Sequence, residues 1–232
     1  MRPLEPILAI TGLASEARIA AGPGIEVICS GCDPARLRAA LDGMLRNRYR
    51  AIFSFGISGA LDPSLKPGQV IVATEITSEA GAWPVAASLA RTLAERLSSL
   101  GQAITCATLV GVNAPVMEAG SKALLRQKTG AASVDMESHV AASFAAAAGV
   151  PVCAIRVISD PADRNLPPLA TQALRSDGRI NVPAVMASLA RNPGQIPLML
   201  RAGRDAGSAF AALRRVRRLL DFGLGLGGAD LR

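Results

Sequence analysis

The sequence is poor in aromatic residues and contains a single histidine. Only 3% of its 232 residues are aromatic. No basic run is interleaved with aromatic side chains, and this argues against a protein that stacks the bases of single-stranded nucleic acid. We therefore expect no nucleic-acid partner.

Cysteine is also scarce, with four residues, two of which form a C-x-x-C motif at Cys29 and Cys32. Such a pair could be a redox couple or half of a zinc site. The other ligands of a zinc site would have to come from distant segments, and His139 is the only histidine. A turn between a strand and a helix explains Gly31 without a metal. We expect neither a metal nor a cofactor.

Long uncharged runs are lacking. The longest, 138–155, contains Gly149 and Pro151, so it indicates a helix followed by a strand and not a membrane span. The first apolar run, 7–14, is too short for a signal peptide and lacks a small-residue cleavage site. A 50% hydrophobic chain of this length suits one α/β domain, which we expect to be cytoplasmic.

Acidic residues are few toward the end of the chain. The net charge is +7, and the part from Arg191 onward has eight arginines, no lysine and three acids, which gives +5. A nearly neutral body with a basic tail suggests that the tail touches an anionic surface.

Strand and helix patterns alternate along the chain, as in α/β proteins. We predict strands at 7–11, 25–30, 51–55, 70–74, 103–112 and 152–158, and helices at 34–48, 85–100, 119–129 and 182–191. A small-residue turn at 12–16 leads into a short segment through Ala20.

Two carboxylates lie at predicted boundaries within 133–163. Bulky apolar residues recur at i, i+4 and i+8 from Met136, which predicts a helix with Glu137 in its first turn. Asp160 falls just past the strand 152–158, where open α/β sheets bind ligands. Each acid also has an ordinary explanation, a turn for Asp160 and the helix dipole for Glu137.

The joint pattern V-D-M-E, helix, strand, R-x-I-S-D resembles the nucleoside phosphorylase and nucleosidase superfamily. The resemblance covers most of the chain. It implies that Glu137, with Met136 beside it, holds the ribose and that Asp160 protonates the leaving base. Ser159 would orient Asp160 at the base.

The same resemblance implies two further contacts. Glu16 matches the acid that activates the attacking water in nucleosidases, although Thr11 stands where the family usually has glycine; without the resemblance, Glu16 is equally a first-turn helix acid. In the base loop, Pro115 would cover a purine face and the backbone of Val116 would read the purine edge.

A small-residue segment follows the strand 51–55. We expect a loop in which Gly56, Ser58 and Gly59 bring backbone N–H groups close to water or an anion. The phosphorylases of this superfamily place an arginine where this chain has Ser54. An anion without a cation is poorly bound, which favours water as the nucleophile.

Two residues receive supporting roles. Arg156, inside the predicted strand 152–158, should pair with an acid near the site. His139 points away from Glu137 around the helix, and we expect a structural or interface role for it.

The segments TGLASEARIAAGPG, SFGISGALDPSLKPG, VDMESH and DPADRNLPP resemble the hopanoid-associated branch of the superfamily over nearly the full length. That branch implies a nucleosidase that releases adenine from adenosylhopane by N-glycosidic hydrolysis, leaving ribosylhopane in hopanoid biosynthesis. The connection 75–84 is shorter than in typical methylthioadenosine nucleosidases, which leaves room for a large apolar 5′ substituent.

The resemblance also implies the architecture: a mixed, mostly parallel twisted sheet flanked by helices, in a homodimer. Residues 1–191 would form the catalytic domain. Residues 192–232 would be a basic, amphipathic, helical C-terminal extension of the same domain. This extension would touch an anionic membrane from the cytoplasmic side, and the last part of the extension would add apolar contacts. Phe210, Leu213, Val216, Leu219 and Leu220 would make those contacts. The alternative is a solvated C-terminal helix that docks on the body of the protein.

Three alternatives remain open: a phosphate-dependent nucleoside phosphorylase, a methylthioadenosine/S-adenosylhomocysteine-type nucleosidase, and a non-catalytic nucleoside- or lipid-binding protein.

Overall fold

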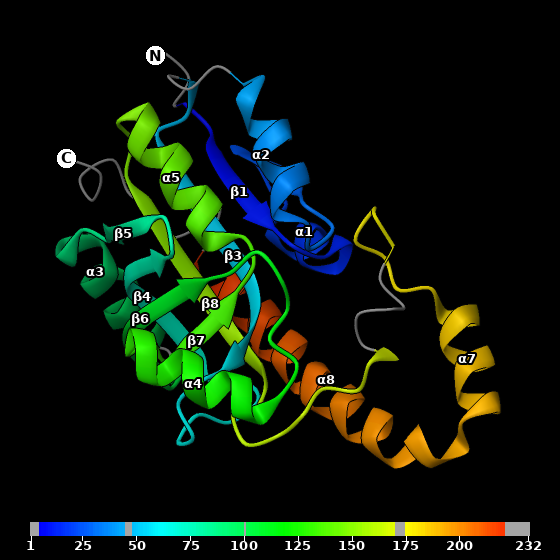
Figure 1. The fold of residues 1–232 in the computed structure, drawn as a ribbon. Helices are drawn as coiled ribbons and strands as arrows, with labels where there is room; N and C mark the ends of the chain where they lie inside the picture. Colours follow the sequence, from blue (N-terminus) through cyan, green and yellow to red (C-terminus); the bar gives the residue numbers. More distant parts are fainter. Residues whose placement is uncertain (1–4, 45–47, 100, 170–174, 221–232) are drawn as a thin grey trace.

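The computed structural model describes residues 5–44, 48–99, 101–169 and 175–220 (Figure 1). Its strands are β1 (Ile7–Thr11), β2 (Ile25–Cys29), β3 (Ala51–Ala60), β4 (Val70–Ser78), β5 (Gly81–Pro84), β6 (Ile104–Gly111), β7 (Ser133–Asp135) and β8 (Val152–Asp160). Its helices are α1 (Ala14–Ala20), α2 (Pro34–Asp42), α3 (Ala87–Ser99), α4 (Ala119–Thr129), α5 (Ser138–Ala148), α7 (Val182–Arg191) and α8 (Ile196–Leu219), with a short 3-10 helix, η2 (Pro193–Gln195), before α8.

The strands form one mixed sheet in the order β2-β1-β3-β7-β6-β4-β5, and β8 pairs with both β3 and β4. Five of the eight strand pairings described are parallel. Because β8 joins β3 to β4, the middle of the sheet closes on itself, and helices cover it on both sides (Figure 1). The predicted mixed, mostly parallel sheet flanked by helices is confirmed.

Local signals set several element ends where the sequence predicted them. Gly130 and Gly149 end α4 and α5 with φ of 69° and 66°, the left-handed region that glycine adopts without strain. At the start of α7, the side chain of Asn181 accepts a hydrogen bond from the N–H of Ala184. These helix ends are therefore set by residues that lie next to them in the sequence.

Other predicted boundaries were wrong. The segment 56–61 was expected to be a loop, yet β3 continues to Ala60 because β8 pairs with it along nearly its whole length. The connection 75–84 instead completes β4 and forms a hairpin with β5. The helix predicted at 34–48 ends at Asp42.

The last helix, α8, has two unlike halves. Its second half packs against β8, β3 and α1, and it buries Ala209, Ala212, Leu213 and Val216 completely or nearly so. Leu220 just beyond it is also buried, and Phe210 and Leu219 are partly buried against the core. The expectation that these side chains contact a membrane is therefore wrong, because they already contact the protein's own core. The division at residue 191 stays a prediction.

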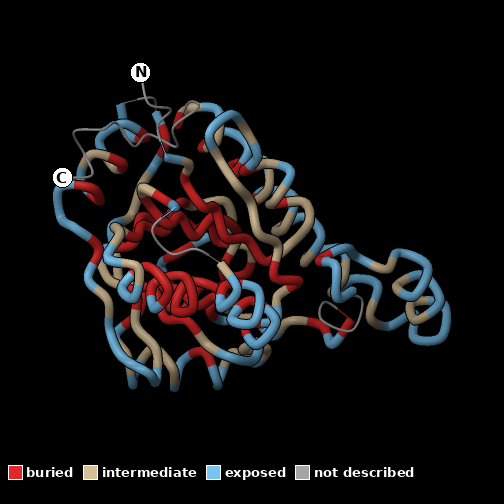
Figure 2. Tube along the Cα trace, turned by 90° about the horizontal axis from the view of Figure 1, so that it is seen from above, coloured by how far each residue is buried: buried red, intermediate tan, exposed pale blue. Residues whose placement is uncertain are grey.

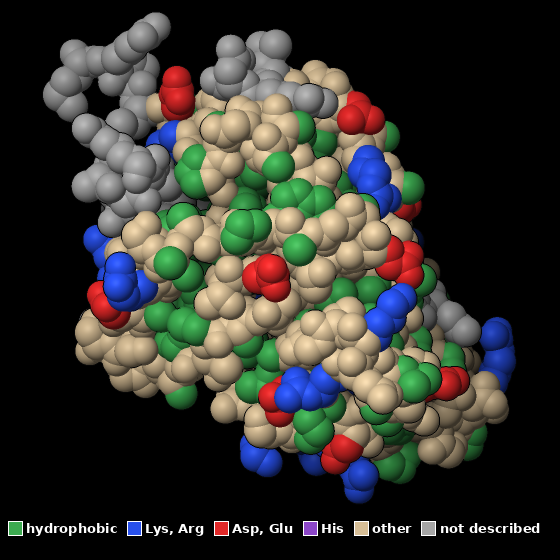
Figure 3. Space-filling view, turned by 60° about the vertical axis from the view of Figure 1, so that its left-hand side comes forward, with side chains coloured by type: hydrophobic (Ala, Val, Ile, Leu, Met, Phe, Trp, Pro, Cys, Tyr) green, Lys and Arg blue, Asp and Glu red, His purple; other side chains and the backbone are tan. Residues whose placement is uncertain are grey.

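Residues 179–204, which we call the arm, extend from the body and contain no buried residue (Figure 2). Five of the six exposed large hydrophobic side chains described lie in the arm, and they are 40% to 61% exposed. They are Ile180, Val182, Met186, Ile196 and Leu200. The arm's four charged residues are all arginines, whereas the body face that carries α3 and β5 shows charges of both signs (Figure 3). None of the helices described is long and apolar enough to cross a membrane.

Candidate active site

The three predicted acids are all buried at element ends. Glu16 lies in the first turn of α1, Glu137 is the residue before α5, and Asp160 is the last residue of β8; they are 2%, 4% and 7% exposed. Glu137 was predicted inside the first turn and Asp160 just past the strand, so both predictions missed by one or two positions. The carboxylate of Glu137 does not cap its helix, which leaves it free for other partners.

Glu16 is held by three backbone N–H groups. Oε2 accepts from Gly12 and Leu13, each at 2.8 Å, and Oε1 accepts from Ile57 at 2.7 Å. Burial raises the pKa of Glu16 above its ordinary value, although the Arg156 guanidinium and these N–H groups oppose the shift. The result is a fixed carboxyl group with an increased proton affinity.

Arg156 lies at the centre of the acids and is completely buried. Its Nη2 is 2.5 Å from Asp135 Oδ2 and 3.7 Å from Glu137 Oε2, and it donates to Ser54 Oγ at 2.6 Å. The predicted pairing of Arg156 with an acid is confirmed. Asp135 was missed, although it stands in the V-D-M-E pattern, because nothing local distinguishes it from a strand-end acid.

Glu137 has a markedly shifted titration. Burial raises its pKa to about 7; Arg156 opposes this, while Asp135 and Glu16 add to it. Its Oε1 accepts a hydrogen bond from Ser30 Oγ at 3.0 Å. Ser30 lies inside the C-x-x-C motif, whose thiols are free, so this motif borders the site through its serine.

Glu16 and Arg156 meet at Gly56. A Cβ atom at Gly56 would lie 2.5 Å from both Glu16 Oε1 and Arg156 Nη1, so only glycine leaves room for these two groups. Arg156 Nη1 and Nε are buried and have no hydrogen-bond partner among the described residues. A buried donor without a partner is costly, and a small polar molecule between Nη1 and Oε1 would satisfy it.

Asp160 lies beside Gly59, three residues further along β3 than Gly56. Its Oδ1 is 2.8 Å from Ser159 Oγ, which also donates to the carbonyl oxygen of Ser58 at 3.1 Å. A Cβ at Gly59 would be 3.1 Å from Asp160 Oδ2, so Gly59 gives this carboxyl group its space. Lys122 Nζ is 2.5 Å from Oδ2, an ion pair that the sequence analysis missed.

The remaining predicted residues are less closely tied to the acids. Met136 is half-buried between Asp135 and Glu137, and Ser58 Oγ is buried without a partner among the described residues. In the loop from β6 to α4, Pro115 is exposed and Val116 packs on a small apolar cluster. Their roles stay predictions.

His139, on α5, contacts α2 and the loop after β6. Its Nε2 is 3.1 Å from Arg38 Nη2 and 3.2 Å from Asn113 Oδ1. Burial lowers its pKa; Asp135 opposes the shift and Arg38 adds to it. These contacts agree with a structural role.

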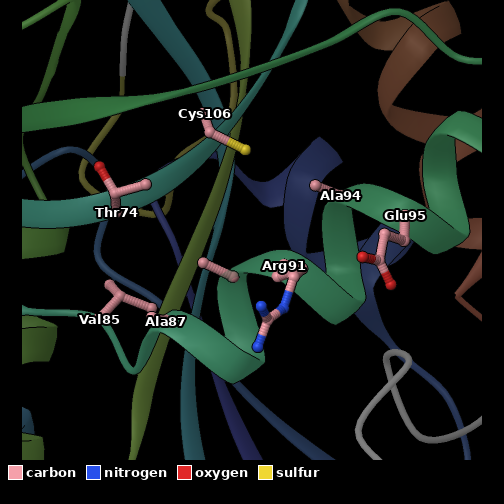
Figure 4. Close-up of a pocket in the computed structure, with 8 residues that line it drawn as sticks. Thr74, Val85, Ala87, Arg91, Ala94, Glu95 and Cys106 are labelled. Carbon is pink, nitrogen blue, oxygen red and sulfur yellow. The ribbon is translucent and has the colours of Figure 1, made fainter.

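Two surface hollows do not contain the acids. One, of about 300 Å³, lies between β4, β6 and α3 (Figure 4). The other, of about 240 Å³, lies between α2, α5 and β5 and is partly lined by His139 and Trp83. In the described ranges, no three histidine, cysteine, aspartate or glutamate side chains converge as a metal site requires.

This arrangement can be compared with known proteins. The family model of the phosphorylase superfamily matches residues 10–191, a range that contains Glu16, Glu137 and Asp160. The chain belongs to the phosphorylase superfamily. It is 32% identical to the futalosine hydrolase of Streptomyces coelicolor over 168 residues. This aligned region covers 60% of this chain and 68% of that relative.

Solved structures agree at the level of the fold. The methylthioadenosine/S-adenosylhomocysteine nucleosidase of Neisseria meningitidis has a TM-score of 0.69 and 15% identity, covering 96% of this chain and all of that one. The futalosine hydrolase of Helicobacter pylori has a TM-score of 0.61 and 18% identity, covering 68% of this chain and 88% of that one. The 32% identical relative is a hydrolase by name, which agrees with the predicted enzyme class, an N-glycosidic hydrolase. The two solved structures, named a nucleosidase and a hydrolase, support the fold.

Proposed function

We propose that the chain hydrolyses a purine nucleoside with water as the nucleophile. The charge balance around Gly56 supports this most directly. Three buried carboxylates, Asp135, Glu137 and Glu16, surround Arg156, the only cation in contact with them among the described residues. A phosphate dianion would add negative charge to this cluster, whereas water would not.

The serine at the phosphorylase arginine position supports the same conclusion. Ser54 Oγ is buried, accepts a hydrogen bond from Arg156 Nη2 and is hydrogen-bonded to Ser138 Oγ at 2.9 Å. Its hydrogen-bonding capacity is therefore used inside the protein.

The proposed chemistry assigns one role to each acid. A water at Gly56 would accept from Arg156 Nη1 and donate to Glu16 Oε1, so Glu16 takes its proton as the oxygen attacks the anomeric carbon. The bond from that carbon to the base breaks, and Asp160 gives its proton to the departing nitrogen. Glu137 would bind the ribose hydroxyls, with Met136 beside them.

We extend the proposal to the substrate. Relatives of this fold have been solved with 5′-methylthioadenosine or a methylthio-immucillin, which supports adenine as the base. The near full-length resemblance to the hopanoid-associated branch supports adenosylhopane, and the short β4–β5 hairpin, in place of a longer connection, would leave the ribose end less enclosed. Pro115, Val116 and Ser159 would then contact adenine.

A membrane-borne substrate needs a membrane contact, which we place on the arm. Gly178 immediately precedes the arm, and its carbonyl oxygen accepts a hydrogen bond from the N–H of Ala14 at 3.0 Å, next to the backbone that holds Glu16. The start of the arm therefore lies beside the loop that holds Glu16, and its exposed apolar side chains and arginines would meet the membrane. A homodimer, as the resemblance implies, completes the proposal.

The test is product analysis. The full chain is incubated with adenosine, methylthioadenosine and adenosylhopane, with and without phosphate, and the base and sugar products are separated by chromatography. We expect adenine and a free sugar, rates independent of phosphate, and a preference for adenosylhopane. Glu16→Gln should lose roughly 100-fold in rate. Stoichiometric ribose 1-phosphate from adenosine would establish a phosphorylase instead.

A further inference from the structure

Helix α4 is attached to the body in an unusual way. Its only fully buried residue is Lys122, which is 0% exposed. Lysine is almost never fully buried unless it is paired, because an ammonium group loses its hydration in the interior. The other lysine in its second half, Lys128, is 73% exposed in its side chain. The position of Lys122 therefore needs a specific explanation.

The ammonium group of Lys122 has three acceptors, one for each of its hydrogens. They are Asp160 Oδ2 at 2.5 Å, the Pro161 carbonyl oxygen at 2.8 Å and the Arg164 carbonyl oxygen at 3.1 Å. All three belong to the end of β8 and the segment that follows it. Lys122 therefore fixes the carboxyl group and the backbone beyond it together.

Two further hydrogen bonds join the same segments. The N–H of Leu166 donates to the carbonyl oxygen of Met117 at 2.8 Å, and the N–H of Ala119 donates to Asn165 Oδ1 at 2.8 Å. The loop before α4 and the segment after β8 therefore form one unit. That unit contains Pro115 and Val116, which are predicted to face the base, and it also contains Asp160.

The two oxygens of Asp160 have different surroundings. Lys122 occupies Oδ2, which leaves Oδ1 for a transferable proton. Ser159 has one hydroxyl hydrogen but two neighbours, Asp160 Oδ1 and the Ser58 carbonyl oxygen. When that hydrogen is donated to Ser58, Ser159 makes no demand on Oδ1, and a proton on Oδ1 can point toward the leaving base.

We propose that Lys122 is a positioning residue that acts through Asp160, holding Oδ2 so that protonated Oδ1 faces the leaving base. This inference rests on the proposed nucleosidase function. Lys122 does not touch the substrate. It aligns the acid with the base loop, and it matters only when the leaving group needs a proton.

The first experiment compares two leaving groups. Lys122→Met is assayed on adenosine and on 4-nitrophenyl β-D-ribofuranoside, whose phenolate departs without a proton. We expect kcat for adenosine to fall about tenfold or more, while the nitrophenyl riboside changes less than about threefold. Lys128→Met is the matched control on the same helix and should leave both rates unchanged. Equal losses on both substrates, or no loss on adenosine, would overturn the proposal.

The second experiment is a double-mutant cycle with Asp160→Asn. If Lys122 acts through Asp160, adding Lys122→Met to Asp160→Asn should cause no further loss on adenosine, and additive losses would contradict this. Thermal melts of the four proteins test the ion pair independently of activity. Asp160→Asn alone should lower Tm, and adding Lys122→Met to Asp160→Asn should restore part of this loss. Independent effects on Tm would overturn the coupling.

Two safeguards separate the possible failures. If Lys122→Met does not fold, Lys122→Gln keeps N–H donors without the charge, and the same split between substrates is expected. If the wild-type chain releases no base from any nucleoside, both the proposed function and the positioning role fail. If the wild type releases the base and the Lys122 variants release it at the same rate, only the role of Lys122 is overturned.

Discussion

At the scale of single residues, one arginine makes the acidic cluster possible. Burying carboxylates without a counter-charge is costly, and Arg156 is shared among Asp135, Glu137 and Glu16. Burial lowers the pKa of Arg156, but these three acids outweigh it and hold the pKa above its ordinary value. Burial raises the pKa values of Glu16 and Glu137, and the single cation, Arg156, only partly opposes these shifts.

The raised pKa of Glu137 predicts a dependence of stability on pH. The folded protein holds this proton up to about pH 7, whereas the unfolded chain releases it near the ordinary value of 4.5. The contribution of Glu137 to stability is therefore complete below pH 4.5 and is lost as the pH rises through 7. Glu137→Gln does not titrate, so its free energy of unfolding relative to the wild type should increase across this window, by up to about 3 kcal/mol.

Urea unfolding of both proteins at pH 4.5 and pH 8 measures this difference. Glu79→Gln, at a side chain that is 90% exposed, is the control and should show no such trend. A difference between Glu137→Gln and the wild type that stays constant with pH would contradict the assignment. In turnover, Glu137→Gln should lose roughly 100-fold or more, if Glu137 binds the ribose in the transition state.

At the scale of elements, α8 is a structural helix in its second half and an exposed one in its first. The second half covers β8, the strand that ends in Asp160. Losing this packing would loosen the strand that positions the acid. A chain truncated at Arg191 should therefore unfold, instead of keeping activity on soluble nucleosides as a detachable tail would allow.

Leu213→Ala and Leu200→Ala make the same change in the two halves of α8. Leu213 is 0% exposed and Leu200 is 57% exposed. We expect Leu213→Ala to cost about 2–4 kcal/mol in free energy of unfolding through the lost contacts and the cavity, and Leu200→Ala to change it by less than about 0.5 kcal/mol. Denaturant unfolding of both variants provides the measurement. Equal effects would mean that the second half of α8 does not pack as described.

At the scale of the whole molecule, the arm projects from the body (Figure 1) and is basic and apolar, whereas the body face that carries α3 and β5 has charges of both signs (Figure 3). Between residues 179 and 204 there are four arginines and no acid. Two arms brought together in a dimer would place like charges side by side, whereas an anionic lipid surface would attract them. Near such a surface each arginine contributes about 1 kcal/mol, or roughly 4 kcal/mol in total, enough for reversible attachment.

Vesicle co-sedimentation tests the arm. The wild type should bind vesicles that contain phosphatidylglycerol, should not bind purely phosphatidylcholine vesicles, and should dissociate as salt is raised. The double variant Val182→Glu with Met186→Glu should lose about tenfold or more in binding, by adding two negative charges near the lipid and removing apolar contacts. All proteins should keep their turnover of soluble adenosine.

Leu124→Glu is the matched control for this test, because Leu124 is a 68% exposed leucine on α4, outside the arm. It should bind vesicles like the wild type. Unchanged binding by the arm variant would rule out the arm as the lipid contact. A change from dimer to monomer in sedimentation velocity would show instead that the arm contacts a second copy.

The sequence by itself determined the features that depend on neighbouring residues. The bounds of α4 and α7 were predicted as observed, because a left-handed Gly130 and a capping Asn181 act within one turn. The acids at the start of α5 and the end of β8 were placed within one or two positions for the same reason. Their joint pattern also indicated the superfamily before the fold was known.

Only the tertiary structure decided what depends on distant partners. The glycines of β3 look like a loop locally and become a strand because β8, about 100 residues later, pairs with them. Lys122 looks like a solvent-exposed lysine until Asp160 meets it across 38 residues of sequence. The two halves of α8 have similar compositions, and the second half becomes part of the hydrophobic core only because the sheet lies beside it. Burial and charge pairing join residues far apart in the chain, so no local pattern could reveal them.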